Sequence, residues 1–104
     1  MFTTALTMQL RPGCLESYRK AHDELWPAIA SSMSENQVSM AIYFQDDRLF
    51  LFAAAPTREH WERSRQSPIL AEWDALMTNC LEASSPWQIA FRTPEKVFGF
   101  GEFH

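Results

Sequence analysis

The sequence predicts an α+β fold in which helices cover one face of an antiparallel sheet. Two observations lead to this prediction. Stretches with alternating apolar residues, typical of strands, are interrupted by stretches with helical spacing, and the order is strand, helix, strand, strand, helix, strand. The 104 residues also suffice to bury one core. We therefore expect residues 1–104 to form one domain.

The chain begins with a predicted strand and a predicted helix. Apolar residues alternate with others in "FTTALTMQL", residues 2–10, as they do in a strand with two different faces. Pro12 and Gly13 are expected to end this strand. Apolar side chains then recur at helical spacing over residues 15–33, which predicts a helix.

A hairpin and a second helical region follow. The stretches "QVSMAIYF" (37–44) and "RLFLFAAAP" (48–56) predict two strands, and the short polar connection between them predicts an antiparallel hairpin. Thr57 and Ser67 each precede a helical pattern, so both are expected to be N-caps. The second of these helices is predicted to run to about Leu81.

The last strand is expected at "EKVFGFG", residues 95–101, after a loop over residues 82–94. This order is that of the βαββαβ ferredoxin-like fold, whose two helices cover one face of the sheet. Both faces of the strand over residues 48–56 are apolar, one through Leu49, Leu51 and Ala53 and the other through Phe50, Phe52 and Ala54. The uncovered face is therefore expected to meet a second copy of the chain in a homodimeric α+β barrel.

Composition narrows the classes of partner and site. The formal net charge of −4 gives no basic surface for nucleic acid, and no apolar run is long enough to span a membrane. The first residues lack a basic leader and are expected not to be a signal peptide. Cys14 and Cys80 are expected to be buried thiols of a cytoplasmic protein and not a disulfide. The three histidines lack metal-ligand spacing, so no metal is expected.

His22 is the candidate for acid–base chemistry. On a helical wheel it lies within an apolar arc, with Tyr18 and Trp26 one turn away on either side. An imidazole can accept or donate a proton near neutral pH, so His22 can serve as a general acid or base. The alternative is a core histidine whose ring makes one hydrogen bond. The residues alone leave both interpretations open.

The second long helical stretch carries a candidate binding pair for a sugar. Trp73 belongs to the apolar stripe of this helix, and Asp74 lies at the edge of the stripe. An indole offers an apolar face to the C–H side of a sugar ring, and a carboxylate accepts a hydrogen bond from a hydroxyl or acts as a base. The other interpretation is a core tryptophan beside a solvated carboxylate.

Five stretches, in this order, are similar to one known family: "MQL", "YRKAHDELWPAI", "AIYF", "HWERSRQSPILAEWDALM" and "EKVF". They resemble the L-rhamnose mutarotase family. The most specific element is the pattern Tyr-x-x-x-His-x-x-x-Trp-Pro, carried here by Tyr18, His22, Trp26 and Pro27. The resemblance implies a small dimeric ferredoxin-like isomerase that interconverts the α and β anomers of a 6-deoxy-hexose without a cofactor.

The resemblance also implies roles for single residues. His22 and Tyr18 match the family's catalytic pair, and Tyr18, Trp73 and Asp74 are the expected contacts of the monosaccharide. Asp74 replaces the second tryptophan of a Trp-Trp pair, and Met40 stands where the family commonly has a sugar-contacting tyrosine. These differences put the identity of the sugar in question, so an L-fucose or other aldose mutarotase is one alternative. A cofactor-free monooxygenase-like enzyme and a non-catalytic sugar-binding domain on the same dimeric scaffold are the others.

Overall fold

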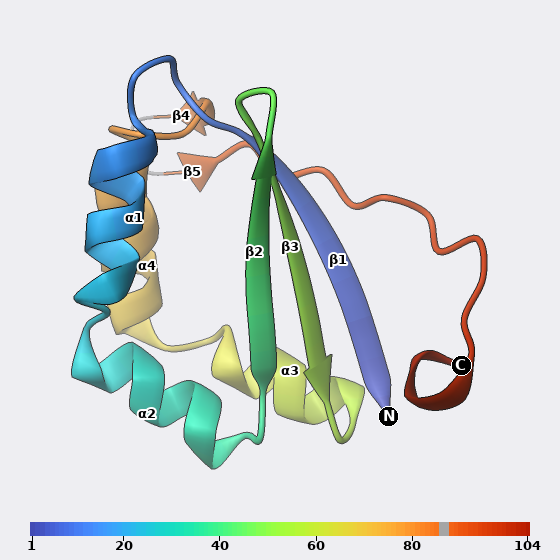
Figure 1. The fold of residues 1–104 in the computed structure, drawn as a ribbon. Helices are drawn as coiled ribbons and strands as arrows, with labels where there is room; N and C mark the ends of the chain where they lie inside the picture. Colours follow the sequence, from blue (N-terminus) through green and yellow to red (C-terminus); the bar gives the residue numbers. More distant parts are fainter. Residues whose placement is uncertain (86–87) are drawn as a thin grey trace.

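The computed structural model describes residues 1–85 and 88–104 (Figure 1). Its helices are α1 (Leu15–Asp23), α2 (Pro27–Glu35), α3 (Arg58–Ser64) and α4 (Pro68–Met77). Its strands are β1 (Phe2–Gln9), β2 (Ser39–Gln45), β3 (Arg48–Ala55), β4 (Ala83–Ser85) and β5 (Gln88–Ile89), and a 3-10 turn spans Gly101–Phe103. None of the helices that the structure describes is long and apolar enough to cross a membrane.

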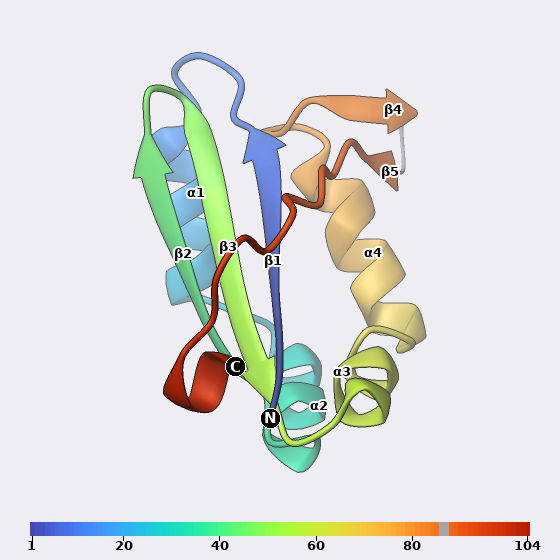
Figure 2. The ribbon, with the colours of Figure 1, turned by 90° about the vertical axis from the view of Figure 1, so that its right-hand side faces the viewer.

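Three antiparallel strands form the main sheet, in the order β1-β3-β2. Leu51 of β3 lies opposite Leu6 of β1 and Ile42 of β2, so these three side chains point to the same face. The helices lie on that face, and the chain after β5 runs to the other side of the sheet (Figures 1 and 2). The α+β class predicted from the sequence is thus confirmed. Strands β4 and β5 form a separate hairpin.

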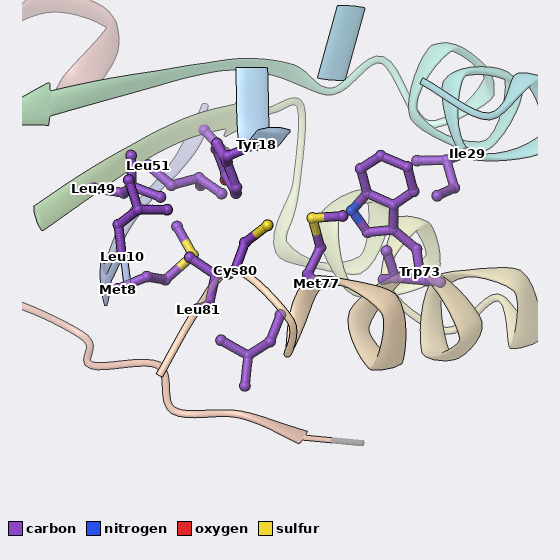
Figure 3. Packing of buried hydrophobic residues seen from close by; sticks show 13 residues of the cluster. Met8, Leu10, Tyr18, Ile29, Leu49, Leu51, Trp73, Met77, Cys80 and Leu81 are labelled. Atoms are coloured by element: carbon purple, nitrogen blue, oxygen red, sulfur yellow. The ribbon is translucent and has the colours of Figure 1, made fainter. Parts of the chain in front are cut away.

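The core lies between the helices and the helix-facing side of the sheet (Figure 3). Leu10, Leu49 and Leu81 are fully buried there. Tyr18 from α1 and Trp73 from α4 belong to the same buried cluster. Each large apolar side chain removed from water contributes about 1.5–3 kcal/mol to the hydrophobic driving force. The core therefore holds α1 and α4 firmly against one sheet face.

The connections follow the predicted turn and cap chemistry. Asp46 and Asp47 form the turn between β2 and β3 with φ values of 54° and 61°, which short polar side chains tolerate in two-residue hairpin turns. The hydroxyl groups of Thr57 and Ser67 accept hydrogen bonds from backbone N–H groups in the first turns of α3 and α4. Both predicted N-caps are therefore confirmed.

The helix predicted over residues 15–33 is in fact two helices. Trp26 has an extended backbone (φ −60°, ψ 132°), and Pro27 opens α2. Proline disfavours a helical conformation in the residue before it and suits the first position of a helix. Pro27 thus ends one helix and begins the next. The helical wheel that placed Trp26 beside His22 therefore does not apply to Trp26. It does apply to Tyr18 and His22, because both belong to α1.

The prediction of a final strand at residues 95–101 is wrong. These residues, all of which the structure describes, form no strand. Main-chain pairing with β1 comes earlier, where Arg92 and Thr7 exchange hydrogen bonds of 2.8 and 3.0 Å. Pro94 has no N–H with which to continue the ladder, and the chain then leaves the sheet edge (Figure 2). The loop predicted over residues 82–94 contains the β4–β5 hairpin instead.

The C-terminus of α4 also differs from the prediction. The helix ends at Met77, and it does not continue to about Leu81. Leu81 instead forms a bridge with Leu10, just after β1, and is fully buried. Pairing with the edge of β1 therefore replaces the last predicted helical turn.

The sheet face without helices is apolar. Tyr43 of β2 and Phe52 of β3 are 63% and 45% exposed on this face, and their rings pack edge to face with centroids 5.8 Å apart. The chain that follows the sheet adds exposed apolar side chains, with Val97, Phe98 and Phe100 more than 80% exposed. An apolar surface of this kind favours contact with another macromolecule.

Candidate active site

A cavity of about 430 Å³ lies between the helices and the helix-facing side of the sheet. Most of its wall is apolar and includes Met40 of β2, Leu51 of β3 and Met77 of α4. Polar side chains interrupt this wall, namely Tyr18, Arg19, His22, Asp23, Arg65 and Asp74. An apolar cavity of this size with a few polar groups is typical of a site for a small molecule.

A hydrogen bond within α1 holds the ring of His22. Its Nδ1 lies 2.9 Å from the backbone carbonyl oxygen of Tyr18, one turn earlier. A carbonyl oxygen only accepts, so Nδ1 carries the hydrogen in the neutral ring and Nε2 carries the lone pair. His22 is half-buried and lines the cavity. Nε2 is therefore the nitrogen that can exchange a proton with a ligand.

Aromatic rings surround this imidazole. The ring centroid of Tyr18 lies 4.2 Å from that of His22, and the indole of Trp73 meets His22 edge-on at 5.3 Å. Trp26 packs edge-on against Trp73 at 5.2 Å. Trp26 thus reaches the site from the turn before α2, and not from α1 as predicted. The rings fix the imidazole and offer an apolar wall to a ligand.

Tyr18 is a hydrogen-bond donor in this environment. Burial raises the pKa of Tyr18 well above its ordinary value, and the nearby Cys80 and Asp74 raise it further because each opposes a phenolate charge. The phenol therefore keeps its proton at neutral pH. Figure 3 shows Cys80 in the same packed cluster as Tyr18. Cys14 and Cys80 are both free thiols.

Two opposite charges reach the cavity from α3 and α4. Arg65 follows the last residue of α3, and its guanidinium carbon lies 5.2 Å from the ring centre of Trp61. Burial lowers the pKa of Arg65 and raises the pKa of Asp74, and each charge opposes the shift of the other. Arg65 was not predicted as a site residue, because it belongs to a charged stretch whose pattern is typical of a solvent-exposed helix surface. Its position just before the Ser67 cap, where the chain turns into α4, was the available signal.

The structure brings the predicted site residues together. Tyr18, His22, Trp73 and Asp74, from α1 and α4, all line the one cavity. Met40 also lines it, because its register opposite Ala53 directs it to the helix-facing side of the sheet. Within residues 1–85 and 88–104, no group of three His, Cys, Asp or Glu side chains is placed to hold a metal ion.

Comparison with known proteins adds a family to this geometry. A family model described as L-rhamnose mutarotase matches residues 3–100. The chain belongs to the L-rhamnose mutarotase family. Members of this family are isomerases that act on carbohydrates. The resemblance noted in the sequence is thus confirmed.

Individual relatives agree with the family model. An L-rhamnose mutarotase from Jannaschia sp. (strain CCS1) is 35% identical over 81 residues, which cover 75% of this chain and 78% of the relative. One from Escherichia coli O8 (strain IAI1) is 29% identical over 87 residues, which cover 81% and 84%. Both matches extend over most of each chain.

Solved structures show the same fold. The crystal structure of an L-rhamnose mutarotase from Formosa agariphila superimposes with a TM-score of 0.82 at 22% identity, covering 97% of this chain and 100% of the other. A putative antibiotic biosynthesis monooxygenase from Nitrosomonas europaea gives a TM-score of 0.65 at 13% identity, covering 94% and 100%. At these identities the likeness concerns the fold alone, and both fit the ferredoxin-like prediction.

The raised pKa of Tyr18 predicts how stability depends on pH. The Tyr18 phenol of the unfolded chain ionises near pH 10, whereas the buried phenol of the folded chain keeps its proton. Ionisation therefore favours the unfolded chain, so the contribution of the phenol to the free energy of unfolding is full below about pH 10 and is lost as the pH rises above it. Urea unfolding of the native chain should show a steeper loss of unfolding free energy between about pH 9 and about pH 11 than Tyr18→Phe. Equal slopes for the native chain and Tyr18→Phe would contradict the prediction.

Proposed function

We propose that this chain interconverts the α and β anomers of a 6-deoxy-hexose of the L-rhamnose type, with His22 as the acid–base group. The observation that carries the proposal is the 2.9 Å hydrogen bond from His22 Nδ1 to the Tyr18 carbonyl, in a ring that lines the cavity. It reserves Nε2 for the ligand. Residues 1–104 act as one mutarotase domain without a cofactor.

Anomer exchange requires a cyclic hemiacetal to open, rotate and close. The protonated imidazole of His22 donates its Nε2 proton to the ring oxygen as the bond from this oxygen to the anomeric carbon breaks. Solvent takes the proton of the anomeric hydroxyl, and an aldehyde forms. After rotation, the neutral imidazole takes the proton back from the hydroxyl as its oxygen attacks the other face of the aldehyde. Solvent returns a proton to the aldehyde oxygen, which becomes the new anomeric hydroxyl. One acid–base group contributes about 10²–10⁴-fold to such a reaction.

The neighbouring side chains hold the sugar during these steps. Tyr18, which keeps its proton, donates a hydrogen bond to a sugar oxygen. Trp73 offers its indole to the C–H face of the sugar ring. Asp74 accepts a hydrogen bond from a sugar hydroxyl. L-Rhamnose is the substrate that the family membership favours, and L-fucose is the second sugar to test.

The functional unit that we propose is a homodimer. Support comes from the apolar face with Tyr43 and Phe52, and from the exposed apolar chain after Pro94 that lies on the same side of the sheet (Figure 2). A second copy related by a two-fold axis can cover both surfaces. Both cysteines are free thiols, which supports the proposal that the protein works in the reducing cytoplasm.

Substitution of His22 tests the catalytic proposal. His22→Ala should lower anomer exchange by about 10²-fold or more per folded molecule, the scale of one acid–base group, while the fold is kept. Tyr18→Phe should cost less, because it keeps the ring and removes only the hydroxyl. Saturation-transfer NMR on L-rhamnose and L-fucose measures the exchange, and thermal unfolding is recorded on the same samples.

The matched control is His60→Ala, which removes a half-buried histidine of α3 that does not line the cavity. It should exchange anomers at the native rate. Near-native exchange by folded His22→Ala would move the chemistry to another residue.

The dimer is tested on the apolar sheet face. The native chain should sediment at about twice its chain mass at micromolar concentration, and Phe52→Glu should sediment as a monomer because a charge cannot be buried without a partner. Leu76→Glu is the control, since Leu76 is also exposed, at 44%, but lies on α4 in the helix layer. A native monomer, or a dimer that survives Phe52→Glu, would refute the arrangement.

A further inference from the structure

Arg65 and Asp74 form a charged pair that the proposed proton transfer does not use. Both line the cavity, Arg65 from the end of α3 and Asp74 from α4. Each charge affects the pKa of the other group, so the two lie near one another. Among the residues that the structure describes, however, their side chains form neither an ion pair nor a hydrogen bond.

Both groups are half-buried and have lost part of their water without forming a hydrogen bond to a residue that the structure describes, which is unfavourable unless a ligand supplies one. The guanidinium of Arg65 has only donors, and the carboxylate of Asp74 has only acceptors. A hydroxyl satisfies both, because its oxygen accepts from one group while its hydrogen is donated to the other. A methyl group can do neither. A carboxylate on the ligand can accept from Arg65 but is repelled by Asp74.

We propose that Arg65 and Asp74 together bind one ring hydroxyl of the sugar, with Arg65 donating to its oxygen and Asp74 accepting its hydrogen. The ring of Trp61 lies against the guanidinium and holds its plane. The pair thereby distinguishes sugars by the position of a hydroxyl. This inference rests on the proposed function, because it names the chemical feature that the same cavity recognises.

Binding of deoxygenated sugars tests the pair. Titration calorimetry is performed with L-rhamnose and with the derivatives that each lack one ring hydroxyl, on the native protein, Arg65→Met and Asp74→Asn. One derivative should bind the native protein about 10- to 100-fold more weakly than L-rhamnose, the range for a hydrogen bond to a charged group. Both variants should bind L-rhamnose more weakly by a similar factor and should no longer distinguish it from that derivative.

Matched variants separate this role from a general effect of charge. Arg63→Met and Glu72→Gln remove the same charges from exposed positions of α3 and α4 outside the cavity, and should bind as the native protein does. Arg65→Lys keeps the charge but not the planar set of donors, so it should recover only part of the affinity. Thermal unfolding of every variant identifies a loss that is due to misfolding.

The outcomes distinguish this inference from the proposed function. The inference is wrong if each derivative binds more weakly than L-rhamnose by the same factor to the native protein and to both variants. It is also wrong if L-mannuronate binds the native protein more tightly than L-rhamnose does. The predicted binding pattern without anomer exchange would overturn the proposed function alone. Anomer exchange with undiminished binding by Arg65→Met and Asp74→Asn would overturn the inference alone. If none of the sugars binds the native protein, both the inference and the proposed function are wrong.

Discussion

The proline at position 27 is the constraint on which the site depends. Because Pro27 disfavours a helical conformation at Trp26, the helix does not continue beyond α1, which ends at Asp23, and the chain turns before α2 begins. This turn releases Trp26 from the helix surface and lets it pack edge-on against Trp73 of α4. Trp73 in turn meets the imidazole of His22. A single backbone restriction thus connects α1, α2 and α4 around one ionisable ring.

In the mechanism that we propose, the site separates its proton-transfer group from its fixed hydrogen-bond donor. Within one turn of α1, the backbone carbonyl of Tyr18 orients His22, while the buried phenol of the same residue retains its proton. The apolar wall of the cavity restricts water and strengthens the few polar contacts that remain. In the proposed reaction, proton transfers assist the breaking and re-forming of one carbon–oxygen bond, which is chemistry that a single acid–base group can accelerate.

Local patterns predicted those parts of the structure that local interactions determine. Alternation located β1, β2 and β3, and the caps at Thr57 and Ser67 depend on residues only a few positions away. Tyr18 and His22 were predicted as neighbours because four residues make one helical turn. The final strand was mispredicted, since an apolar alternation does not say whether a neighbouring strand has a free edge. Arg65 was missed because only the path of the chain between α3 and α4 brings it to the cavity.

The most direct test of the account is the tautomer of His22. Nitrogen-15 NMR of the uniformly labelled protein, with His22→Asn used to assign the ring among the histidines, measures which nitrogen carries the hydrogen in the neutral form. We predict hydrogen on Nδ1, a free lone pair on Nε2, and a change confined to the Nε2 resonance when L-rhamnose is added. Hydrogen on Nε2 in the neutral ring, or an Nε2 signal indifferent to the sugar, would contradict it.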